Sequence, residues 1–108
     1  MSVEIHDNSR EVSENIKAAL LRGLETCGAS AERFAKKLAP YDTGNLRNSI
    51  THTVDEEEPA AYIGTNVEYA PYQELGTINM EAHPFLKPAV ADHANEYRKI
   101  IEKELKNG

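Results

Sequence analysis

The sequence predicts a small α+β domain, because one long helical pattern precedes two alternating segments and a further helical pattern. Apolar residues from Val12 to Leu38 recur at every third or fourth position, which is typical of one face of an amphipathic helix. Residues 50–54 and 60–67 alternate instead, as antiparallel strands do. We therefore expect the order β-α-β-β-α-α, in which a small antiparallel sheet packs against a long N-terminal helix and a C-terminal helix, with a short helix between them. The length of 108 residues indicates one domain over residues 1–108.

The N-terminal third is expected to hold a short strand and the long helix. Residues 3–5 alternate apolar and polar side chains, and residues 8–11 have the pattern of a capping box before a helix of about 30 residues. Gly23 and Gly28 lie inside this helix, and each costs about 1 kcal/mol relative to alanine. One bent helix and two shorter helices therefore both remain open. Pro40 ends the helix, because the residue before a proline disfavours the α conformation.

A β-hairpin is expected next. Residues 50–54 form its first strand and residues 60–67 its second, joined by the charged turn "DEEEP". The expected inward-facing residues of the second strand are Ala61, Ile63 and Val67.

The rest of the chain is expected to hold a short helix, a loop and the last helix. In "EYAPYQELGT", Pro71 suits the first helical turn, and Gly76 suits the left-handed position after the helix end. "TINMEAH" lacks periodicity and indicates a loop, "PFLKP" is expected to be extended, and Pro88 can open the last helix. A further strand near Phe85 is left open. The apolar stripe of the last helix would consist of Val90, Ala94, Tyr97, Ile101 and Leu105.

The tripeptide Asp42-Thr43-Gly44 has two interpretations. Aspartic proteases of the retroviral type carry one such tripeptide per short chain and pair two aspartates, about 3 Å apart, by dimerising. That fold is almost entirely β, whereas Asp42 follows a helical pattern here, so we favour a turn. Asp42 then accepts hydrogen bonds from backbone N–H groups, Gly44 adopts a positive φ, and Leu46 and Ile50 enter the core.

Composition and charge exclude several function classes. The formal net charge is −6, so the cationic surface that sequence-specific nucleic-acid binding requires is not expected. The single cysteine, Cys27, lies on the apolar stripe, and His52 lies on the apolar face of a strand, so both are expected to be structural. The histidines lack metal-ligand spacing, and no catalytic residue, cofactor or metal is expected. The polar N-terminus and the short apolar runs favour a protein made in a cytoplasm over a membrane protein.

Three segments occur in an order that points to a known family. These are "APYDTGNLRNSI", "YIGTNVEYAPYQELGT" and "HPFLKPA". The set resembles the gene-10-product-like minor tail family of tailed phages, whose members are also described as tail-completion or head–tail joining proteins. The resemblance covers nearly the whole chain and is firmest from Ala39 to Ala89. The loop "TINMEAH" departs from the family pattern, because it carries Glu81 and no Lys or Arg.

The resemblance implies a non-enzymatic structural protein of a phage or prophage, made in the bacterial cytoplasm and located at the neck or tail of the virion. It would cap the tail tube, join it to the head connector and self-associate into a ring, commonly a hexamer, through which DNA passes without specific binding. The motif residues that would hold the scaffold are Asp42, Thr43, Gly44, Leu46, Gly64, Tyr69, Pro71, Gly76, Pro84 and Phe85. We expect the assembly interface at Glu56, Glu57, Glu58, Ile78, Asn79, Met80 and Glu81.

Two alternatives belong to other classes. One is a small intracellular binding module of a mobile element, of the toxin or inhibitor type, and the other is a dimeric aspartic protease acting through Asp42. Tyr69 and Phe85 are also left open between core positions and positions that face a partner.

Overall fold

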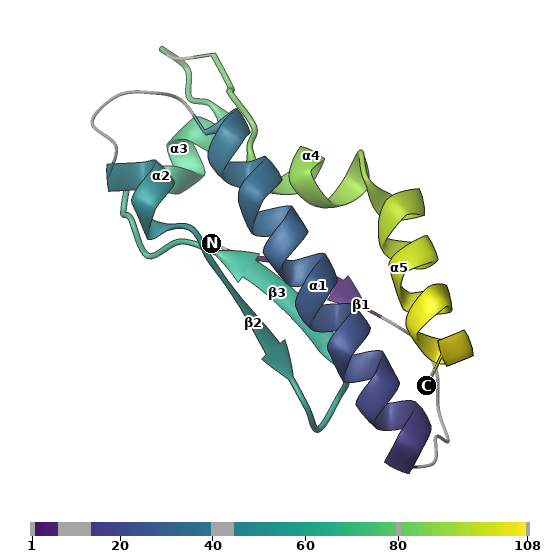
Figure 1. Cartoon of the computed structure of the whole chain (residues 1–108). Helices are drawn as coiled ribbons and strands as arrows, with labels where there is room; N and C mark the ends of the chain where they lie inside the picture. Colours follow the sequence, from purple (N-terminus) through teal and green to yellow (C-terminus); the bar gives the residue numbers. More distant parts are fainter. Residues whose placement is uncertain (1, 7–13, 40–44, 80, 108) are drawn as a thin grey trace.

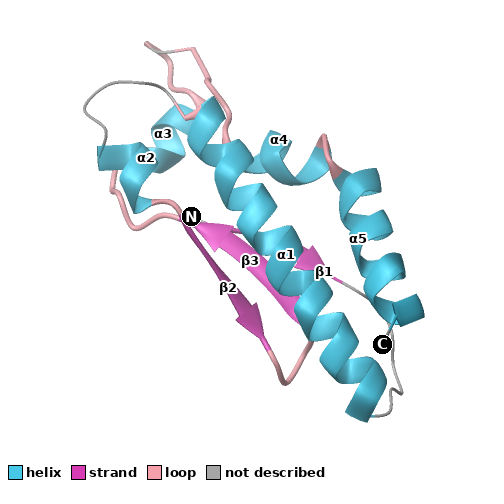
Figure 2. Ribbon diagram, viewed as in Figure 1, coloured by secondary structure: helices cyan, strands magenta, loops and turns pink. Residues whose placement is uncertain are grey.

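The computed structural model of the chain has the predicted α+β architecture (Figures 1 and 2). It describes residues 2–6, 14–39, 45–79 and 81–107. The Cα atoms extend over 50 × 23 × 22 Å. The elements in chain order are β1 (Ser2–His6), α1 (Glu14–Leu38), α2 (Asn45–Ser49), β2 (Thr51–Asp55), β3 (Ala60–Gly64), α3 (Ala70–Leu75), α4 (Leu86–Ala91) and α5 (Ala94–Asn107).

The three strands form one antiparallel sheet in the order β1-β3-β2. β3 lies in the centre, where Ile63 pairs with Val3 on one side and with His52 on the other. β2 and β3 form the predicted hairpin, and residues 56–59 make its turn. α1 lies along one face of this sheet, and α5 packs beside α1 (Figure 1). The predicted packing of the long helix against the sheet and the C-terminal helix is therefore confirmed.

α1 is one continuous helix of 25 residues, which resolves the alternative that its two glycines left open. A Cβ at Gly23 would lie 3.3 Å from the Cα of Ile101 in α5. A Cβ at Gly28 would lie 2.8 Å from the Cδ2 of His52 in β2. The glycines therefore stand where α5 and the sheet approach the backbone of α1, and close packing offsets their low helix propensity.

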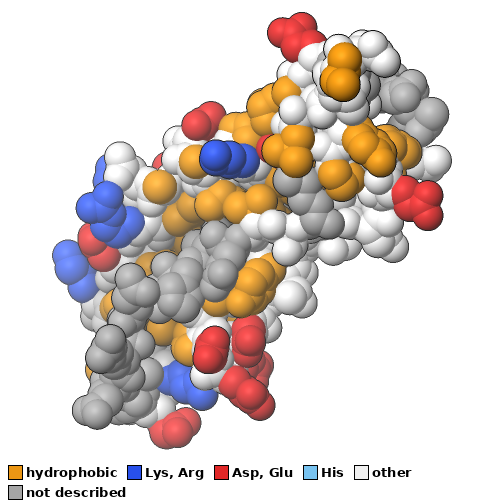
Figure 3. Space-filling view, turned by 180° about the vertical axis from the view of Figure 1, so that it is seen from behind, with side chains coloured by type: hydrophobic (Ala, Val, Ile, Leu, Met, Phe, Trp, Pro, Cys, Tyr) orange, Lys and Arg blue, Asp and Glu red, His pale blue; other side chains and the backbone are white. Residues whose placement is uncertain are grey.

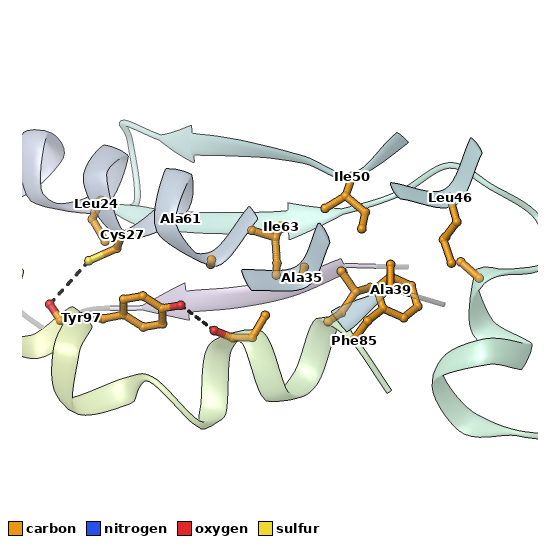
Figure 4. Packing of buried hydrophobic residues seen from close by; sticks show 14 of the residues in the cluster. Leu24, Cys27, Ala35, Ala39, Leu46, Ile50, Ala61, Ile63, Phe85 and Tyr97 are labelled. Carbon is orange, nitrogen blue, oxygen red and sulfur yellow. Dashed lines mark hydrogen bonds between the residues drawn. The ribbon is translucent and has the colours of Figure 1, made fainter. Parts of the chain in front are cut away.

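The apolar stripe of α1 forms the centre of the core (Figure 4). Leu24, Cys27 and Ala35 are fully buried and cluster with Ile63 of the central strand. Phe85 is the largest fully buried side chain in the described part of the chain. Further buried members of the cluster are Leu20, Ala31, Leu46, Ile50, Leu86 and Tyr97, so the predicted burial of Leu46 and Ile50 is confirmed.

Two helices, α4 and α5, replace the single last helix that the sequence predicts, and a turn at 92–93 separates them. The extended conformation predicted for "PFLKP" is wrong from Leu86 onward, and the described residues around Phe85 form no strand. Pro88 occupies the third position of α4. Its missing N–H is tolerated there, because the N–H groups of a first turn have no intrahelical partner.

Two element boundaries also differ from the prediction. Residues 45–49 form the short helix α2, where a turn was expected. β3 ends at Gly64, three residues earlier than predicted, because the Thr65 hydroxyl accepts the N–H of Val67 at 3.1 Å and turns the chain towards α3. The capping-box pattern at residues 8–11 and the tripeptide Asp42-Thr43-Gly44 lie outside the described residues.

Candidate assembly surface

A buried carboxylate fixes the base of the loop between α3 and α4. Glu74 is only 5% exposed. Its Oε1 accepts the N–H of Phe85 at 3.1 Å and that of Leu86 at 2.8 Å. Its Oε2 accepts the N–H of Lys87 at 3.3 Å. The N–H groups at a helix start have no intrahelical partner, so this carboxylate satisfies three donors that burial would otherwise leave unpaired. One side chain of α3 therefore stabilises the start of α4.

Gly76 directs the chain away from α3. Its N–H donates to the carbonyl of Tyr72 at 2.8 Å, and its backbone has φ 77° and ψ 174°. The positive φ agrees with the prediction, but the ψ lies outside the left-handed helical region, in a region that glycine alone adopts readily. The chain returns at His83, whose N–H donates to the carbonyl of Gln73 at 2.7 Å. The loop therefore has a closed base made by α3 and the residues before α4.

Three apolar side chains are exposed beside this base. Tyr72 is 57% exposed, Leu75 is 72% exposed and Ile78 is 102% exposed. We call these three residues the apolar end. Figure 3 shows hydrophobic side chains gathered at the upper end of the molecule, over α3 and the loop that follows it. These side chains are the most exposed large apolar residues in the described part of the chain.

The hairpin turn, the second predicted interface element, is acidic and hydrogen-bonded. The Oδ1 of Asp55 accepts the N–H of Glu57 at 2.9 Å and that of Glu58 at 3.3 Å. The side chains of Glu56, Glu57 and Glu58 are all exposed. We call residues 55–58 the acidic turn. It lies at the end of the sheet opposite the apolar end (Figure 1).

The predicted motif residues occupy several kinds of position. Phe85 is fully buried and belongs to the core. Tyr69 is partly buried, packs against the core cluster and precedes α3, whose first turn contains Pro71. Leu46 is buried, and Gly64 ends β3. Pro84 is exposed, as are Ile78, Asn79 and Glu81 of the predicted assembly interface. Asp42, Thr43, Gly44 and Met80 lie outside the described residues.

His52 joins the sheet to α1 through two carboxylates. Its Nε2 lies 2.6 Å from the Oε1 of Glu25, and its Nδ1 lies 3.0 Å from the Oε1 of Glu32. Burial alone would lower the pKa of His52, but the hydrogen bonds and charges of the two glutamates outweigh burial and raise it above 6.5. Burial alone would raise the pKa of Glu32. The hydrogen bonds and charges of His52 and Lys36 outweigh burial, so the pKa of Glu32 lies below its usual value of 4.5. The structural role predicted for His52 is confirmed.

Two buried polar side chains of the core, Cys27 and Tyr97, make hydrogen bonds to backbone carbonyls. Burial raises the pKa of the Cys27 thiol to about 11, and its Sγ lies 3.5 Å from the carbonyl oxygen of Tyr97. The Tyr97 hydroxyl donates to the carbonyl of Ala89, and burial raises its pKa to about 12. Both hydrogen bonds are drawn in Figure 4. In the described part of the chain, no group of three or more His, Cys, Asp or Glu could hold a metal ion.

Sequence reasoning missed two features. The first is Glu74, which lies within α3 and whose partners lie beyond a loop. The second is a hollow of about 530 Å³ at the end of α1. We call it the basic hollow. It is lined by Glu32, Arg33, Lys36 and Lys37 of α1 and by Arg47 of α2. The spacing of the three basic residues on α1 was visible in the sequence, but the position of α2 was not.

The described chain is thus an α+β domain with hydrogen-bonded buried polar groups and two exposed ends of different chemistry. Residues 4–76 match the family model described as "Bacteriophage HK97-gp10, putative tail-component", and the chain belongs to this family. It is therefore a phage tail component, a class of virion protein that contacts other virion proteins. No curated protein and no solved structure matches the chain. Among the helices of the described ranges, none combines the length and hydrophobicity that a membrane span requires.

Proposed function

We propose that this chain is a tail-completion protein of a tailed phage or prophage, which caps the tail tube and joins it to the head connector. It is made in the host cytoplasm and forms a ring, commonly a hexamer, on the end of the tail. Membership of the tail-component family supports a place in the virion. The observation that carries the finer proposal is the apolar end. Two of its side chains lie on α3, and the third, Ile78, lies on the loop whose base Glu74 fixes.

The apolar end suits a contact that forms during assembly. Burial of one Leu or Ile side chain contributes about 1.5–3 kcal/mol, and Leu75 and Ile78 leave this contribution unused in the isolated chain. The closed loop base reduces the conformational entropy that docking would cost. A tail-tube or connector surface that covers these side chains would therefore gain affinity from a preorganised site.

The proposal assigns the chain a binding role and no enzymatic activity. A dimeric aspartic protease is built almost entirely from β-strands, whereas this chain packs a 25-residue helix across a three-stranded sheet. The net charge of −6 favours a ring through which DNA passes without adhering. Neither the binding role nor the passage of DNA through a ring needs a cofactor.

The experiment that tests this proposal is deletion of the gene from its phage, followed by complementation. The deletion is expected to give filled heads beside unattached tails, and the wild-type chain is expected to restore joined particles. Ile78→Asp should fold normally but fail to restore joining, because it places a charge in the apolar contact. Ile16→Asp is the matched control, since Ile16 is 44% exposed on α1 and lies away from the apolar end.

Infectious particles formed at normal titre without the gene would overturn the proposal. Altered growth of the host, with normal particles, would favour the toxin or inhibitor alternative. Full complementation by Ile78→Asp would show that the apolar end has no part in joining.

A further inference from the structure

The basic hollow concentrates positive charge in an otherwise acidic chain. Four cations and one carboxylate line it, which gives a formal charge of 4 − 1 = +3, against −6 for the whole chain. The carboxylate, Glu32, is already bonded to His52 and lies 3.2 Å from the Nζ of Lys36. Arg33 and Lys37 are exposed at the rim. The helix dipole places only about half a negative charge at the C-terminus of α1. The positive charge of the hollow is therefore larger than compensation of this dipole requires.

The acidic turn has the complementary charge. Asp55 and the three glutamates carry a formal charge of −4, and the hydrogen bonds from Glu57 and Glu58 to Asp55 hold the turn in one conformation. The turn projects from the end of the hairpin, where it is accessible to another molecule (Figure 1). The hollow opens widely to solvent, so the carboxylate side chains of such a turn can reach its cations from outside.

The two surfaces cannot meet within one molecule. The basic hollow lies where α1 ends beside α2, and the acidic turn lies at the far end of β2 (Figure 1). A contact between them therefore needs a second copy. Such a contact uses two different patches on each subunit, and contacts of this head-to-tail type generate rings when the rotation between subunits closes.

We propose that the acidic turn of one copy docks into the basic hollow of the next copy. This inference rests on the proposed tail-end ring and names the subunit contact that builds it. The occupant is a second copy rather than a nucleic acid, because the chain itself carries an exposed element of four carboxylates whose charge is opposite to that of the hollow. The contact is electrostatic, so it steers subunits into register and weakens as salt rises.

The test is cross-linking in assembled particles. A chain with Glu57→Cys and Lys37→Cys complements the deletion phage, and purified particles are treated with a short bismaleimide. Because each subunit then carries one cysteine in each patch, a ladder of covalent multimers up to the ring size is expected. Each single-cysteine chain should give no ladder, and the buried Cys27 is common to all samples. Particles that contain the chain but give no ladder would overturn the inference and leave the tail-completion role standing.

Charge reversal provides a second test that does not depend on cross-linking geometry. The set Glu56→Lys, Glu57→Lys and Glu58→Lys and the set Arg33→Glu and Lys37→Glu should each lower the infectious titre by roughly tenfold or more, since like charges would then face each other. The two sets combined should recover most of the titre, because attraction is restored with its sign reversed.

The same chains would be tested for binding to a duplex DNA probe. No recovery in the combined chain, or loss of DNA binding on Arg33→Glu and Lys37→Glu alone, would overturn the inference and assign the hollow to nucleic acid. A charge-reversed chain that is absent from particles fits the loss of the subunit contact, so the combined chain decides this test. A wild-type chain that never enters particles would count against the proposed function itself.

Discussion

The carboxylate of Glu74 lies 2.8 Å from the backbone nitrogen of Leu86, although the two residues stand 12 positions apart in the sequence. This contact begins α4 and closes the base of the loop that carries Ile78. The position of Ile78, one of the three residues of the apolar end, therefore depends in part on one buried acidic side chain. Its removal should affect the stability of the chain and the presentation of the loop together.

Replacement of Glu74 by alanine is expected to lower the free energy of unfolding by at least about 3 kcal/mol, because hydrogen bonds to a charged group contribute about 1.5–3 kcal/mol each and the two buried ones, from Phe85 and Leu86, are lost. Glu74→Gln should cost less, since one acceptor oxygen remains. Urea unfolding measures the change, and amide exchange at Leu86 and Lys87 should accelerate. Glu81→Ala, an exposed acidic residue of the same loop, is the control and should change stability by less than about 0.5 kcal/mol. Equal stabilities of Glu74→Ala and Glu81→Ala would contradict the role of Glu74.

The bonds of His52 to Glu25 and Glu32 predict a pH dependence of stability. The pKa of His52 is raised from 6.5, so its contribution is full below pH 6.5 and is lost as the pH rises through the folded pKa. The pKa of Glu32 is lowered from 4.5, so its contribution is present above pH 4.5 and is lost as the pH falls through its folded pKa. Both contributions are therefore present together between about pH 4.5 and 6.5.

Urea unfolding of the wild type and of His52→Gln across pH 4 to 9 measures this effect. The other histidines are common to both chains, so their contributions cancel in the difference in free energy of unfolding. The wild type should lose more stability than His52→Gln as the pH rises above 6.5. NMR titration of His52 should give a pKa above 6.5. Parallel stability curves for the two chains would contradict the pairing.

Substitution of Gly28 by alanine should destabilise the chain, although alanine is favoured over glycine in a helix by about 1 kcal/mol. The added Cβ would stand 2.8 Å from the ring of His52, which its two glutamate partners hold in place. The expected net loss is about 1–2 kcal/mol, as for overpacking in general. In a His52→Ala background the same change should become stabilising, because the obstructing ring is gone. A stabilising effect of Gly28→Ala in the wild-type background would show that the ring moves aside freely.

The thiol of Cys27 should react slowly in the folded chain. Burial raises its pKa from 9.0 to about 11, which lowers the thiolate fraction near pH 8 by about a hundredfold, before any loss of access. Reaction with a chromogenic disulfide reagent, in buffer and in urea, measures the ratio of rates. A native rate within tenfold of the unfolded rate would mean that the core around α1 opens readily.

The sequence predicted those parts of the fold that depend on local periodicity. The stripe that contains Leu20, Leu24 and Ala31 identified α1, because helix periodicity is recorded directly in the chain. Alternation around Ile63 identified the hairpin for the same reason. The periodicity from Val90 onward could not indicate the turn at 92–93, since the residues on either side continue one apolar stripe.

The features that sequence reasoning missed depend on contacts between distant segments. α4 begins at Leu86 because a carboxylate on another helix accepts its N–H, and no local pattern encodes that partner. The two glycines of α1 suggested a break, whereas they serve close approaches by His52 and Ile101. The basic hollow requires Arg47 of α2 to stand beside the end of α1, which only the tertiary fold decides.

The central claim, that the chain occupies the head-proximal end of the tail, is tested most directly by locating it in the virion. Particles complemented with an epitope-tagged chain would be labelled with gold-conjugated antibody and imaged by electron microscopy. The account predicts label at the junction between head and tail of joined particles. Label confined to the distal tip of the tail, label spread along its length, or particles without the chain would contradict it.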